Sequence, residues 1–196
     1  MANTDADRGF TPVKYMDGRP YTGAARRFFK DATAGILGVG DPVIRVTNSS
    51  ATSNAGGYPE CVRATTGSAI SGVVVGIEPI RSALGQNHLA AADVGYLLVA
   101  TSPDLLFEVQ DNGGATALTI ADIGEHIDSV TALDANTTTG RSKYEIDTEA
   151  QATDNTWRIE ALVDRPDNAT GANAKWLVSA NLHTEVNASA STKTEV

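Results

Sequence analysis

Short apolar segments separated by turn residues limit what this chain can fold into. From about residue 36 onward, segments of about five to seven residues alternate with clusters of Gly, Asn, Asp, Ser and Pro. Residues 157–163 and 176–182 alternate apolar and polar side chains, as half-buried strands do. The pattern predicts about eight to ten short strands and at most two short helices, which is typical of a mainly β fold: an antiparallel β-sandwich or barrel, jelly-roll-like.

Other segments carry weaker signals of the same kind. The uninterrupted apolar run at residues 72–77 predicts a strand buried on both faces. Residues 119–123 fit either a strand or one helical turn, and the Asp-Asn-Gly-Gly sequence at 111–114 predicts a type I′ hairpin turn. Further strands are predicted at residues 43–47, 61–65, 94–100, 105–110 and 127–133.

Length and composition set broad limits. The chain has 196 residues, enough for one domain or one domain with an arm, and its 41% apolar and 20% charged residues exclude wholesale disorder. The N-terminus lacks the apolar stretch of a signal peptide, and no apolar segment approaches the roughly 20 residues that span a bilayer. We therefore expect a protein made in the cytoplasm, with no membrane partner.

Charge is distributed unevenly along the chain. The whole sequence carries 15 basic and 24 acidic residues, a net charge of −9, which disfavours nucleic-acid binding. Residues 1–30 hold six basic and three acidic residues, so this segment is at +3 and the remainder at −12. The same 30 residues hold five of the eleven aromatic side chains, and glycines and prolines interrupt any regular period.

This composition predicts an extended basic and aromatic N-terminal arm over residues 1–35, followed by a β-rich body over 36–184 and a loose tail over 185–196. An arm of this kind lies on the surface of another molecule. The alternative is a strand or loop folded back on the chain's own acidic body. The residues expected to contact the partner are Arg8, Phe10, Lys14, Tyr15, Arg19, Tyr21, Arg26, Arg27, Phe28 and Phe29.

No catalytic signature is present in the sequence. There is no Gly-x-Ser-x-Gly elbow, and the single cysteine, Cys61, lies in a strand-like segment that indicates a small buried hydrophobic residue. The three histidines are far apart, so we expect no metal site and no cofactor. Glu108 and Glu160, on separate strands, would act as glycosidase carboxylates do if they faced each other across a cleft, but so acidic a chain produces such pairs by chance. We therefore expect a structural protein with no catalytic residues.

Several strings along the chain carry a likeness to a known group of proteins. They are residues 1–5 (MANTD), Gly9-Phe10, Pro12-Val13, 40–43 (GDPV), 74–79 (VVGIEP), 104–110 (DLLFEVQ), 137–140 (TTTG), 162–168 (LVDRPDN) and 171–178 (GANAKWLV). In these strings the chain resembles the small capsid decoration, or cement, proteins and related head proteins of tailed bacteriophages.

The resemblance implies a β-rich body on the outer surface of the virion capsid, where it clamps neighbouring copies of the major capsid protein as a homotrimer or, alternatively, a dimer. The body contains few aromatic residues, which separately predicts that neighbouring subunits of an oligomer complete its core. Three alternatives stay open: a carbohydrate-binding or head-fibre-base adhesion module, a β-fold hydrolase, and a head-completion protein. For the first, Trp157 and Trp176 would have to be exposed, whereas their positions in the strand pattern predict core packing.

Overall fold

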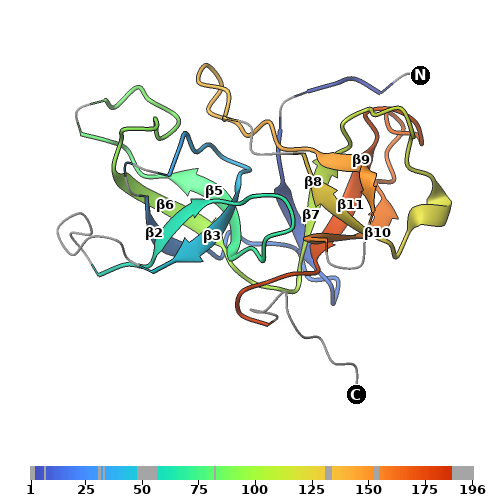
Figure 1. The fold of residues 1–196 in the computed structure, drawn as a ribbon, viewed down its shortest axis with the longest axis horizontal. Coiled ribbons are helices and arrows are strands. Elements are labelled where there is room, and N and C mark those ends of the chain that lie inside the picture. The colour runs from blue at the N-terminus through green and yellow to red at the C-terminus, as the bar shows by residue number, and fades with distance from the viewer. Residues whose placement is uncertain are drawn as a thin grey trace.

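The computed structural model describes residues 3–6, 8–30, 32, 34–47, 57–81, 83–130, 134–151 and 155–186. Within these ranges the chain forms a six-stranded sheet and a closed five-stranded barrel, which lie side by side in Figure 1. One short 3₁₀ helix, η1 (Ile120–Asp122), accompanies the strands. The predicted mainly β fold is confirmed.

The sheet is antiparallel throughout, with the strand order β1-β7-β11-β10-β8-β9. Its strands are β1 (Thr11–Tyr15), β7 (Leu105–Gln110), β8 (His126–Ser129), β9 (Ile146–Gln151), β10 (Trp157–Leu162) and β11 (Lys175–Ala180). The short N-terminal strand β1 lies at one edge, where its Pro12 is tolerated.

The barrel closes in the order β2-β4-β3-β5-β6, with β2 and β4 parallel and the other pairs antiparallel. Its strands are β2 (Arg26–Lys30), β3 (Pro42–Val46), β4 (Glu60–Arg63), β5 (Gly72–Ile77) and β6 (Gly95–Ala100). Gly72 allows β5 to pass close to β6, because a Cβ on Gly72 would lie 2.1 Å from the carbonyl oxygen of Ala100.

Two hydrophobic clusters form the core. One fills the barrel and includes Phe28, Leu97 and Val99. The larger one joins the sheet to the barrel, because Val73 and Ala100 of the barrel strands pack in the same cluster as the side chains on the inner face of the sheet. Trp157 and Trp176 are both fully buried in this larger cluster, as their alternating positions predict.

The strand predictions are confirmed for all segments between residues 43 and 110, with small differences at the ends, and residues 119–123 contain the helical turn. The hairpin predicted at 111–114 is wrong. β7 pairs with β1 and β11 and not with the next strand in sequence, β8. Residues 72–77 are fully buried only in their first half. The strand β9 carried no recognised signal in the sequence.

The prediction of a separate N-terminal arm is also wrong. The alternative, a segment folded back on the body of the same chain, is correct. β1 belongs to the sheet and β2 to the barrel, so the predicted boundary at residue 35 divides no structural unit. Phe10, Phe28 and Phe29 are 1%, 1% and 3% exposed, because the N-terminal segment supplies core side chains. Of the predicted tail, residues 187–196 lie outside the described residues.

Candidate interaction surface

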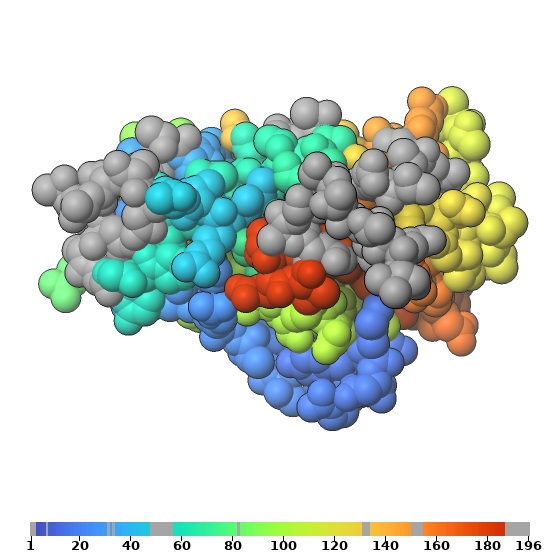
Figure 2. Space-filling model, turned by 60° about the horizontal axis from the view of Figure 1, so that its bottom comes forward, coloured from blue at the N-terminus to red at the C-terminus, as the bar shows by residue number. Residues whose placement is uncertain are grey.

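One exposed part of the N-terminal segment is a tight hairpin over residues 13–21, which we call the N-terminal hairpin. The Tyr15 N–H donates to the Arg19 carbonyl at 2.8 Å, and the Tyr21 N–H donates to the Val13 carbonyl at 3.0 Å. The Met16 N–H donates to the carbonyl of Asp104 just before β7, which fixes the hairpin to the sheet. Figure 2 shows the blue N-terminal residues protruding at the bottom of the view.

The N-terminal hairpin combines exposed apolar side chains with cations. Val13 and Met16 are 40% and 51% exposed, whereas most large apolar side chains of the described residues are buried. The Arg19 side chain lies over the Tyr15 ring, 5.0 Å from its centroid, and is held by a 2.6 Å hydrogen bond from its Nε to Asp17. Hydrogen bonds from Arg19 also lower the pKa of the Asp17 carboxyl. These contacts link the side chains at the hairpin tip to one another, and such preorganisation lowers the cost of binding.

Two further predicted contact residues, Arg26 and Arg27, lie on β2, which follows the N-terminal hairpin in the sequence. Arg27 lies over the rings of two tyrosines, with its guanidinium carbon 4.7 Å from the Tyr58 ring centroid and 3.7 Å from that of Tyr96, and it makes a two-pronged ion pair with Glu78. Arg26 is exposed and lies 3.3 Å from Glu185. Both arginines therefore bind the chain's own body.

The ten predicted contact residues thus separate into four groups. Lys14, Tyr15, Arg19 and Tyr21 come together in the hairpin, although both tyrosines are half-buried. Phe10, Phe28 and Phe29 are core residues, and Arg26 and Arg27 are paired within the chain. Arg8 is exposed and lies at the N-terminal approach to β1.

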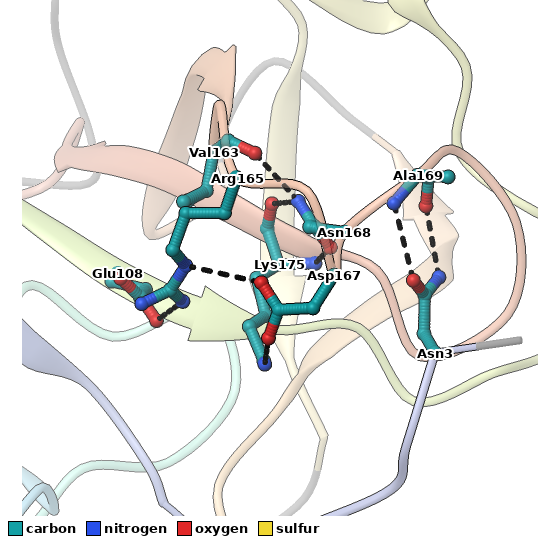
Figure 3. Close-up of polar contacts among 8 residues, drawn as sticks. All are labelled: Asn3, Glu108, Val163, Arg165, Asp167, Asn168, Ala169 and Lys175. Atoms are coloured by element: carbon teal, nitrogen blue, oxygen red, sulfur yellow. Dashed lines mark hydrogen bonds and ion pairs between the residues drawn. The ribbon is translucent and has the colours of Figure 1, made fainter. Parts of the chain in front are cut away.

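Beside β1, an ordered loop covers one end of the sheet. Residues 163–175 are fastened by Asn168, whose side chain donates to the carbonyls of Val163 and Lys175 and accepts from the Lys175 N–H, each at 2.9 Å (Figure 3). Arg165 in this loop donates a hydrogen bond to Glu108 on β7. The Asn3 side chain pairs with both backbone groups of Ala169, at 2.8 and 3.1 Å, and so docks the start of the chain on the loop.

A buried carboxylate, which the sequence did not identify, fastens the other end of this loop. Asp111 is fully buried and accepts hydrogen bonds from the N–H groups of Gly113 and Asn173 and from the indole of Trp176, at 3.0, 2.7 and 3.2 Å. Burial raises the pKa of Asp111 against these bonds, which lower it. Asn173 has a φ of +61°, a backbone conformation that the hydrogen bonds from Asn173 and Trp176 to Asp111 hold in place.

The residues that the sequence raised as catalytic candidates are either buried or bound by other side chains. Cys61 is fully buried, and burial raises the pKa of its thiol to about 12, so it is the small hydrophobic residue that the sequence predicted. Glu108 is bound by Arg165, and Glu160 accepts a 2.6 Å hydrogen bond from Ser179. Among the residues that the structure describes, no three His, Cys, Asp or Glu side chains are grouped as metal ligands.

Comparisons with family models, curated proteins and solved structures found no match to this chain. In the described parts of the chain, no helix has the length and apolar character needed to cross a membrane.

Proposed function

We propose that this protein is a structural component of a tailed-phage virion, which binds the outer surface of the assembled capsid and cements neighbouring major capsid subunits. The observation that carries the proposal is the N-terminal hairpin, a fixed protrusion with exposed Val13 and Met16 beside Lys14 and Arg19. Apolar anchors with adjacent cations are typical of protein-binding surfaces. The partner, the major capsid protein, is inferred from the resemblance to capsid decoration proteins.

The cementing effect would follow from the coupling between binding of this protein and assembly of the shell. A protein that binds the assembled shell and not free subunits stabilises assembly by mass action. Several contacts per homotrimer, or per dimer, add avidity on a symmetric lattice. The acidic body, at −12 beyond residue 30, faces solvent in this proposal, where its net charge keeps neighbouring copies soluble.

Capsid binding is preferred to the alternative of a carbohydrate-binding or adhesion module. The two tryptophans that would form a sugar platform are 0% exposed. The most exposed apolar side chains on the N-terminal segment, Val13 and Met16, are aliphatic, and aliphatic groups favour a protein partner over a sugar ring.

Sedimentation with capsid shells tests this proposal. The probe is a shell assembled from the major capsid protein of the virion that this proposal assigns to the chain. We expect wild-type protein to co-sediment with intact shells and not with dissociated subunits, and Met16→Asp to weaken binding at least about tenfold. Leu84→Asp is the matched control, since Leu84 is 74% exposed on a barrel loop. Equal binding by wild type and Met16→Asp, or no wild-type binding, would contradict the proposal.

A further inference from the structure

A small pocket lies where β1, β7 and β11 meet, next to the loop of residues 163–175. Its lining residues are Arg8, Gly9, Thr11, Glu108, Val109, Gln110 and Lys175. Its free volume is about 10 Å³, the space of one water molecule, so of a larger ligand only one oxygen atom enters the pocket. The backbone there is fixed, because Gly9 has a φ of +63° and a Cβ on it would lie 2.2 Å from the Cβ of Ser142.

Gln110 gives the pocket its chemistry. This side chain is only 4% exposed, yet neither its Nε2 nor its Oε1 has a hydrogen-bond partner among the residues that the structure describes. A buried amide without partners costs about 1 to 3 kcal/mol, so native proteins seldom keep one without a ligand or water that satisfies it. The adjacent Asp111, also buried, uses both of its oxygens.

The charges at the pocket favour an anion. Arg8 is exposed and makes no ion pair within the described residues. Lys175 lies directly opposite Gln110 in the β7–β11 register, and its nearest carboxylate, Asp167, is 3.9 Å away. Glu108, the pocket's own acid, is already neutralised by Arg165 (Figure 3). Arg8 is therefore free to pair with an entering carboxylate, and Lys175, whose ion pair with Asp167 is long at 3.9 Å, lies beside it as a second cation.

We propose that the Gln110 pocket is a binding site for one carboxylate side chain, Asp or Glu, of the protein on which this chain docks. The carboxylate accepts a hydrogen bond from Gln110 Nε2 and pairs with Arg8 and Lys175. The pocket is continuous with β1, and β1 continues into the N-terminal hairpin, so one short element carries both contacts. The identity of the partner rests on the function proposed above, whereas carboxylate binding by the pocket does not.

The first test uses acetate as the probe. Acetate titrated at constant ionic strength should give saturable NMR shifts of the Gly9 and Val109 amides, which line the pocket. Arg8→Gln should weaken this binding on the order of fivefold or more, while Arg141→Gln, at another exposed arginine, should leave it unchanged. No saturable response, which indicates a bound water only, or an equal response in Arg8→Gln would overturn the proposal.

The second test uses the capsid shell. Gln110→Leu removes the unpaired amide while keeping the side chain's size, so the folded protein should be as stable as wild type or more stable. We expect its affinity for shells to fall about tenfold. Unchanged shell binding by Gln110→Leu, with loss in Met16→Asp, would overturn the docking role of the pocket and leave capsid binding standing. An acetate response without any shell binding would uphold the carboxylate site and overturn the proposed function.

Discussion

The ring of Phe10 stacks on the indole of Trp157, with centroids 4.0 Å apart and planes inclined by 15°. Phe10 belongs to the N-terminal segment whose composition predicted an arm, and Trp157 begins β10 in the centre of the larger core. The contact joins the start of the chain to strands more than 100 residues later in the sequence. The N-terminal segment is therefore part of the folding unit.

Replacement of Phe10 should therefore destabilise the whole protein. Phe10→Ala leaves a cavity beside Trp157, and the free energy of unfolding should fall by about 3 to 5 kcal/mol in urea titrations. Met16→Ala, on the exposed hairpin, should change it by less than about 0.5 kcal/mol. Equally small effects of both substitutions would indicate that the N-terminal segment does not contribute to the core.

The stacked Arg27 should not tolerate lysine. Lysine keeps the charge but loses the two-pronged ion pair with Glu78 and the stacking on Tyr58 and Tyr96. Because the pair is about one-third exposed, we expect only a modest loss of stability. A double-mutant cycle with Glu78→Gln in urea unfolding measures the coupling, and a coupling of zero would show that stacking alone holds Arg27.

Replacement of Asp111 by asparagine, its nearest isostere, should destabilise the folded protein. Asp111→Asn replaces one of two accepting oxygens by an NH₂ group, which then faces an N–H donor. We expect a loss of about 2 to 3 kcal/mol and faster hydrogen exchange at Gly113 and Asn173. The nearby exposed Asp164→Asn serves as the control and should be neutral. Unchanged exchange in Asp111→Asn would contradict the proposed anchoring of the loop.

Asp41 should give the stability of the protein a specific pH dependence. It is fully buried, and burial raises its pKa from 3.8 to about 6, against hydrogen bonds from Ser142 and Gly38 and the charge of Arg63. The folded state thus holds the proton more tightly than the unfolded chain. The resulting stabilisation is fully present below about pH 4 and is lost as the pH rises through about 6.

The comparison with Asp41→Asn isolates this effect, because the asparagine does not titrate and the other carboxyls are common to both proteins. Between pH 3.5 and 7, the stability of wild type relative to Asp41→Asn should fall by on the order of 2 to 3 kcal/mol. Urea unfolding at a series of pH values gives the difference. Parallel stability profiles would mean that the carboxyl of Asp41 titrates normally.

The sequence predicts the body of this fold because its strands carry local signals. The alternation at 157–163 and 176–182 and the apolar run at 72–77 mark strands within about one to two residues of their observed ends. Strands β1 and β2 give no such signal, since β1 contains Pro12 and the β2 sequence, RRFFK, does not alternate apolar and polar residues. Their partners, β7 and β6, lie far along the chain, and long-range pairing leaves no mark on local composition.

The candidate site was predicted in part. The sequence predicted Arg8, Lys14 and Arg19 as contact residues, and their side chains are exposed or half-buried. It could not show that Phe28 points into the barrel and Phe10 into the larger core. The Gln110 pocket depends on the register that sets Lys175 opposite Gln110, and the Asp111 anchor depends on where the loop of residues 163–175 folds. Both follow from tertiary pairing, for which a single sequence holds no period or motif.

Imaging of capsid shells mixed with this protein, by electron cryomicroscopy, tests the central proposal most directly. We expect ordered density for the protein on the outer surface of the shell, in symmetric groups, with the N-terminal hairpin facing capsid subunits and the acidic body facing solvent. Bare shells, or bound protein with Val13 and Met16 turned toward solvent, would contradict the proposed function.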